Sequence, residues 1–166
     1  MLGTSAGVEA MDGPIGPHTD QSTRVQCVID YYGPTNFLRM NDFESRIDHD
    51  AADSPESQLI GGAIQEHKKK ALTADPISYV DKGDAPFLIM HGTKDMLVPY
   101  NQSVLLHNAL KKAGVWSALL TVDGGGHSGG RGALPERFRT FIEFHLLGNK
   151  GIIADETIPV AKVRIR

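Results

Sequence analysis

The order of apolar and amphipathic segments in this 166-residue sequence predicts an α/β fold with a parallel sheet. Three segments are apolar without alternation, as expected of strands buried on both faces, and they cover residues 25–32, 86–91 and 116–122. Helical segments at 101–113 and 135–147 follow the second and third strands. Strands that alternate with helices form right-handed crossovers in a parallel sheet. The sequence therefore predicts a three-layer α/β/α sandwich.

The strand predictions depend on β-branched and aromatic residues that lie between turn-forming residues. Residues 25–32 read VQCVIDYY and end at Gly33-Pro34. Residues 86–91 read PFLIMH and lead into the polar turn that begins at Gly92, whereas residues 116–122 read WSALLTV. Each run is short and apolar throughout, which favours a buried strand over a surface one.

The two helices after these strands have recognisable ends. The segment 101–113 has an apolar stripe and is followed by Gly114, the residue type expected just beyond a helix end. Pro135 suits the first turn of the segment 135–147, which Gly148 follows. We therefore expect both helices to pack against the sheet.

Residues 35–62 are polar and predict an irregular excursion between the first two strands. A helix is expected next, over 63–71, with the lysines of 68–70 near its C-terminal end, where they would complement the helix dipole. This run of lysines is too short to predict a site for a polyanion.

The chain is long enough for one domain with its own core, which we expect over residues 1–148. Residues 1–24, rich in Gly, Pro, Ser, Thr and Asp, predict an irregular lead-in loop. The tail at 149–166 is ambiguous, because the alternation over 160–165 fits either an edge strand or a linker.

Composition excludes several classes of function. A hydrophobic content of 40% with 22% charged residues is typical of a globular protein, and a net charge of −3 argues against nucleic acid as a partner. No run approaches the roughly 18 apolar residues that a membrane span needs. Cys27 is the single cysteine, so no internal disulfide can form. The first residues lack the charged and apolar regions of a signal peptide, and the cellular compartment stays open.

Two polar residues lie just beyond strand ends, where parallel sheets carry their reactive groups. Asp95 follows the second strand in HGTKDMLVP, and His127 follows the third in DGGGHSGG. A carboxylate and an imidazole on neighbouring strand ends can meet, and the carboxylate would then orient the ring and stabilise its protonated form. The chain order, acid and then histidine, is the one expected of an α/β-hydrolase. We predict that Asp95 and His127 form a catalytic pair.

Longer segments carry a resemblance to a known family: GPTNF at 33–37, SPESQLIGG at 54–62 and the block at 86–99. They resemble the esterase/lipase branch of the α/β-hydrolases, more narrowly bacterial feruloyl-esterase-like and acetyl-esterase-like proteins, with prolyl-oligopeptidase catalytic domains more distant. The resemblance implies that Asp95 is the triad acid and His127 the triad histidine. It also implies a carboxylic ester substrate, of a short acyl or aryl acid, with no metal or organic cofactor. Asn36 departs from the family, which commonly has Asp there.

Ser5 lies in GTSAG, which matches the G-x-S-x-G pattern of a hydrolase nucleophile. That pattern requires a strand before the serine and a helix after it. Only two residues precede Gly3, and Gly13-Pro14 would stop a helix after about one turn. We therefore expect Ser5 to be a loop serine lying far from His127.

The resemblance places the true nucleophile upstream, so this chain is expected to be the C-terminal half of a serine hydrolase. Three alternatives stay open: a minimal esterase that uses Ser5, a peptidase of the prolyl-oligopeptidase type, and a non-catalytic interaction module. The strand at 25–32 would lack one neighbour and expose an apolar edge. We expect that edge to be covered, either by self-association or by a segment of this chain that folds over it. The segments available are 1–24 and the tail at 149–166, and of these two the tail is favoured.

Two further histidines have structural interpretations. His91 lies at a strand end but belongs to a turn signature, and we expect it to be structural and hydrogen-bonded to backbone. His49, between Asp48 and Asp50, has the look of a metal cluster, but adjacent loop residues rarely converge on one ion. No metal site is predicted.

Overall fold

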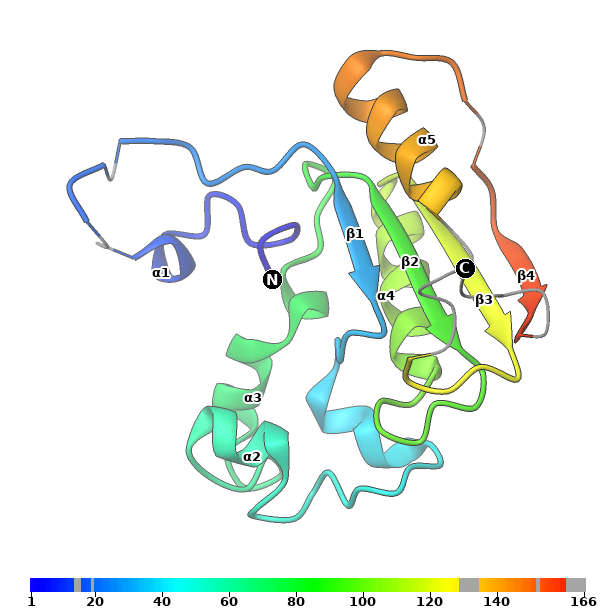
Figure 1. Ribbon diagram of the computed structural model, residues 1–166. Helices are drawn as coiled ribbons and strands as arrows, with labels where there is room; N and C mark the ends of the chain where they lie inside the picture. The colour runs from blue at the N-terminus through cyan, green and yellow to red at the C-terminus, as the bar shows by residue number, and fades with distance from the viewer. Residues whose placement is uncertain (14–15, 19, 129–134, 152, 161–166) are drawn as a thin grey trace.

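The computed structural model describes residues 1–13, 16–18, 20–128, 135–151 and 153–160, and within them the chain forms a parallel sheet flanked by helices (Figure 1). The sheet has four strands in the order β1-β2-β3-β4, and every neighbouring pair is parallel. The strands are β1 (Val28–Tyr31), β2 (Phe87–Gly92), β3 (Ser117–Asp123) and β4 (Glu156–Pro159). The predicted α/β class is confirmed.

The described part of the chain also contains five α-helices and two short 3-10 helices, of which α1 precedes the first strand. The α-helices are α1 (Glu9–Asp12), α2 (Pro55–Ile60), α3 (Lys68–Ala74), α4 (Asn101–Ala113) and α5 (Pro135–Leu147). The 3-10 helices cover Phe37–Asp42 and Pro76–Tyr79. The bounds of α4 and α5 agree with the sequence prediction, and Gly114 has the left-handed φ of 81° that ends α4.

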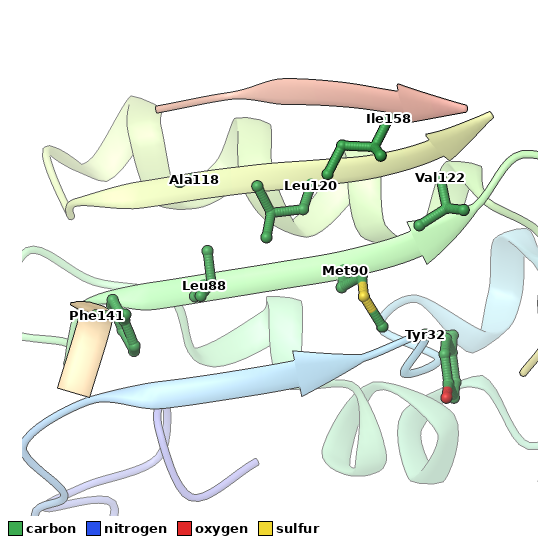
Figure 2. Close-up of a cluster of buried hydrophobic side chains, with 8 residues drawn as sticks. All are labelled: Tyr32, Leu88, Met90, Ala118, Leu120, Val122, Phe141 and Ile158. Carbon is green, nitrogen blue, oxygen red and sulfur yellow. The ribbon is translucent and has the colours of Figure 1, made fainter. Parts of the chain in front are cut away.

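Alternation along β2 divides the core between the two faces of the sheet. Phe87 and Ile89 pack with Leu106 and Leu110 of α4. Leu88 and Met90 belong to the cluster on the opposite face, which Figure 2 shows together with Phe141 of α5. Since every residue of β2 is buried, this strand is covered on both faces, as its continuous apolar sequence predicts.

The excursion between β1 and β2 has more structure than the sequence analysis predicted. Ser54 caps α2, because its hydroxyl accepts a hydrogen bond from the Ser57 N–H at 3.1 Å, and Pro55 fills the first helical position. Gly61 ends the helix in a left-handed conformation with a φ of 73°. Ser54 and Pro55 thus begin a helix inside the segment 35–62, for which the sequence predicted only irregular structure, and that prediction was wrong here.

The helix predicted over 63–71 starts later, at Lys68. The residue before it, His67, has a φ of −111° and a ψ of 44°, which lie outside the helical region, so residues 63–67 form turns instead. The lysines therefore occupy the first turn of α3, where they do not complement the helix dipole. The predicted placement of these charges was wrong.

The tail joins the sheet at the edge opposite to the expected one. β4 pairs with β3, with Thr157 beside Thr121, whereas β1 forms the other edge. The prediction that the tail covers the edge of the strand at 25–32 is therefore wrong for the described residues. Most of the alternating stretch at 160–165 lies outside the described residues. The N-terminal residues, in contrast to β4, lie beside β1, since Gly3 packs against Val28 and Phe87.

Asp75 anchors the excursion from inside the protein. It is buried, and its Oδ1 accepts a hydrogen bond from the Phe37 N–H at 2.8 Å, while its Oδ2 has no hydrogen-bond partner among the described residues. Burial raises the pKa of Asp75 from 3.8 to about 6, against the opposing effect of the Phe37 N–H. Between about pH 4 and pH 6, Asp75 is therefore protonated in the folded state but ionised in the unfolded chain.

Because the pKa of Asp75 is higher in the folded state, stability should fall as pH rises from about 4 to about 6. Asp75→Asn keeps the acceptor for Phe37 and removes the charge. We expect it to raise the free energy of unfolding at pH 8 by about 1–2 kcal/mol, and to have a smaller effect at pH 4. Denaturant titrations at the two pH values measure this, with the exposed Asp53→Asn as control. An equal effect at both values would contradict the assignment.

Candidate active site

Asp95, the predicted acid, lies in the tight loop of residues 93–98 that follows β2 (the acid loop). Asp95 is buried, and its backbone N–H donates to the Gly92 carbonyl at 3.3 Å. Its Oδ1 accepts hydrogen bonds from the N–H groups of Leu97, at 2.9 Å, and Val98, at 3.0 Å. The loop folds around its own carboxylate, which fixes the direction of the second oxygen, Oδ2.

Backbone contacts join this loop to the loop that follows β3. The Thr93 N–H donates to the Val122 carbonyl at 3.0 Å, and the Lys94 N–H donates to the Gly125 carbonyl at 2.8 Å. Gly92 makes this approach possible, because a Cβ at that position would overlap the backbone of Gly125. The two loops therefore form one unit at the C-terminal end of the sheet.

Within this unit the predicted pair meets. His127 Nδ1 lies 2.8 Å from Asp95 Oδ2, as the strand-end argument predicts. The Asp95 side chain is fully buried, whereas 40% of the His127 side chain is exposed. Since Nδ1 faces a carboxylate, it carries the proton of a neutral ring, which leaves the Nε2 lone pair free to accept a proton.

The carboxylate is held in its charged form. Burial by itself would raise the pKa of Asp95, but hydrogen bonds from His91, Leu97, Val98 and His127 outweigh it and lower the pKa to about 2. Asp95 is therefore ionised throughout the neutral range. An ionised partner stabilises the imidazolium that forms when His127 takes up a proton.

Tyr32, just past the end of β1, packs beside His127, a contact that the sequence analysis did not predict. Its ring lies 4.7 Å from the His127 ring, measured between centroids, and the side chain is buried. Its φ of 44° is positive, which is uncommon for a residue other than glycine. The sequence signal is weak, since Tyr32 stands in an apolar strand run and only its conformation distinguishes it.

The segment between β1 and β2 also makes hydrogen bonds to the acid loop. The Ser45 hydroxyl and the Arg46 N–H both donate to the Met96 carbonyl, at 3.1 and 2.8 Å. Ser45 in turn contacts His49 Nε2, and His49 Nδ1 lies 2.9 Å from Glu56 Oε2. His49 is thus engaged in a buried polar network. Among the described residues, no group of three or more His, Cys, Asp or Glu side chains could hold a metal ion.

Ser5 lacks the surroundings of a nucleophile. It is buried in a stretch of turns, and the helix that follows, α1, has only four residues. Within the ranges that the structure describes, no hydrogen bond joins the Ser5 side chain to His127. The site therefore presents an acid and a histidine.

None of the helices described is long and apolar enough to cross a membrane.

The fold and this carboxylate–histidine pair define an α/β protein of the hydrolase type. The sequence model of the BD-FAE family matches residues 1–110, a span that includes Asp95 and ends before His127. The chain belongs to the BD-FAE family, within the esterase branch of the α/β-hydrolases. The predicted resemblance is confirmed. No curated protein matches the chain.

Solved structures agree with this family. A structure described as a truncated form of a carbohydrate esterase from gut microbiota has 31% identity and a TM-score of 0.67, over 76% of this chain and 47% of that one. The bifunctional GH43-CE protein of Bacteroides eggerthii has 32% identity and a TM-score of 0.68, over 76% and 17%. Esterase 2 of Thermogutta terrifontis, at 24% identity and a TM-score of 0.60 over 86% and 51%, shares the fold. The chain thus spans about half the length of the gut-microbiota esterase.

The contact between the two loops gives a prediction for Gly92. Gly92→Ala places a methyl group against the Gly125 backbone, so the loop carrying His127 must move. We expect a loss of about 1–3 kcal/mol in the free energy of unfolding and disruption of the contact between Asp95 and His127. Denaturant titration and the NMR signals of His127 measure the two effects. Gly126→Ala is the matched control, because its nearest neighbour, the Lys94 carbonyl oxygen, would be 3.8 Å away. Equal stability of both variants would contradict the prediction.

Proposed function

We propose that this chain supplies the acid and the base of a serine esterase, with Asp95 as the acid and His127 as the base. The observation that carries the proposal is the 2.8 Å contact between His127 Nδ1 and Asp95 Oδ2, with the His127 side chain partly exposed. Membership of an esterase family supports the reaction class. The substrate is a carboxylic ester of a short acyl or aryl acid, and the carbohydrate esterases among the similar structures favour an ester carried on a carbohydrate.

The proposed chemistry is acyl transfer in two steps. A serine hydroxyl attacks the ester carbonyl while His127 Nε2 accepts its proton, and the protonated ring then donates that proton to the departing alkoxide. Water hydrolyses the acyl-serine by the same route, with Nε2 again accepting a proton and returning it to the serine. The ionised Asp95 holds Nδ1–H in place and stabilises the imidazolium in both steps.

The serine comes from outside this chain in the proposed enzyme. Support comes from the turns around Ser5 and from the gut-microbiota esterase, of which the chain covers 47%. A polypeptide that carries the nucleophile would add a strand beside β1, which forms an edge of the sheet. A groove of about 630 Å³ adjoins that strand, lined largely by apolar side chains that include Val28, Ile29 and Phe37.

The proposal is tested by completing the domain. The chain is co-expressed with the half of the gut-microbiota carbohydrate esterase that lies outside the match, and hydrolysis of p-nitrophenyl acetate and methyl ferulate is measured. We expect the complex to hydrolyse these esters and the chain alone to be inactive. By sedimentation the chain alone should self-associate through β1, since this strand forms an edge of the described sheet and a sheet edge can template another strand. Ester hydrolysis by the chain alone, lost in Ser5→Ala, would instead support the minimal esterase.

Within that complex, variants at the pair should abolish most of the activity. We expect His127→Ala and Asp95→Asn each to lower kcat/KM by about 10³-fold or more, because the base is lost in one and its orientation in the other. His18→Ala and Asp53→Asn, both on the surface, are the matched controls and should keep full activity. Unchanged kcat/KM in His127→Ala would exclude the proposed base. Cleavage of proline peptides without ester hydrolysis would favour the peptidase, and assembly without turnover the interaction module.

A further inference from the structure

A second histidine contacts the oxygen of Asp95 that holds His127. His91, at the end of β2, places its Nε2 3.1 Å from Asp95 Oδ2. The His91 side chain is completely buried, unlike that of His127. The sequence analysis expected a backbone partner for His91, and one is present, since Nε2 also lies 2.9 Å from the Val98 carbonyl oxygen. The contact with Asp95 was not predicted.

The partners of His91 determine where its proton resides. Nε2 faces two acceptors, the Asp95 carboxylate and the Val98 carbonyl, so it carries the hydrogen and donates to both. Nδ1 lies 2.7 Å from the Ser103 Oγ, and the Ser103 hydroxyl donates to it. With Nε2 as the donor, Nδ1 is the acceptor of the Ser103 hydroxyl, and the ring is the tautomer in which Nε2–H points at the carboxylate.

The surroundings of the ring also fix its orientation. Tyr32 and Tyr100 both pack against it in edge-on geometry, with centroid distances of 6.0 and 5.8 Å. Ser103 belongs to α4 and Val98 to the acid loop, so the ring connects β2, α4 and that loop. Rotation of the ring would break its hydrogen bonds to both, which is costly for a side chain that is completely buried.

We infer that His91 is a positioning residue, which acts on the base His127 through the shared oxygen of Asp95. Its Nε2–H holds Oδ2 on the line toward His127 Nδ1, so that the carboxylate keeps the direction in which it orients the base. This role rests on the proposed function, in which Asp95 orients the base. The established family membership does not assign it.

A role in packing alone would depend on the size of the side chain, whereas positioning depends on the Nε2–H donor. His91→Phe keeps a buried ring and removes the donor. His91→Gln places an amide N–H in about the position of Nε2 and keeps the donor. The two variants therefore separate a positioning role from a packing role. The comparison can be made by NMR without any turnover, so the role of His91 can be decided even if the esterase proposal fails.

The test uses nitrogen-15 NMR of the whole chain at pH 7. In the wild type, His91 should show the pattern of a ring protonated at Nε2 and unprotonated at Nδ1. The His127 Nδ1 proton, hydrogen-bonded to a carboxylate, should give a far-downfield signal that His91→Gln retains and His91→Phe loses. Backbone amide spectra report whether each variant is folded.

Two results would overturn the inference. One is a folded His91→Phe variant that keeps the His127 signal as the wild type does. The other is a wild-type His91 with its proton on Nδ1, since such a ring could not donate to Asp95. The second result requires no variant, so it decides the question even if His91→Phe does not fold.

Discussion

The site depends on one buried carboxylate that four N–H donors surround. Leu97 and Val98 hold one oxygen of Asp95, while His91 and His127 share the other. Burying an unpaired carboxylate would be costly, so these donors must stay in place for the loop to fold as it does. The groups that stabilise the charge therefore also direct it at His127, and local stability and the geometry of the site have the same origin.

The parallel sheet brings these donors together. β2 and β3 end side by side, so their loops exchange backbone hydrogen bonds, and Gly92 allows the close approach. In the part of the chain that the structure describes, β1 lies at the other end of the strand order from β4 and pairs with β2 alone. Asp95 and His127 thus follow two strands that have partners on both sides, whereas the proposed nucleophile would enter beside β1, at the edge of the sheet. A site divided in this way would form its own acid–base pair before the serine is added.

The sequence predicted the features that depend on local periodicity. The helices at 101–113 and 135–147 and the strands before them follow from apolar stripes and glycine stops, and the Asp95–His127 contact follows from strand order. α2 was missed because six residues are too few for a periodic signal, although Ser54 and Gly61 mark its ends. The pairing of β4 with β3, the contact of His91 with Asp95 and the conformation of Tyr32 depend on residues distant in sequence or on the folded backbone.

The most direct test of the proposed division is to locate the serine that becomes covalently labelled. The complex completed with the half of the gut-microbiota esterase is treated with a fluorophosphonate, which reacts only with an activated serine, and the adduct is mapped by mass spectrometry. The account predicts an adduct on the added half that disappears when His127 is replaced by Ala. An adduct on Ser5, or labelling that persists without His127, would contradict it.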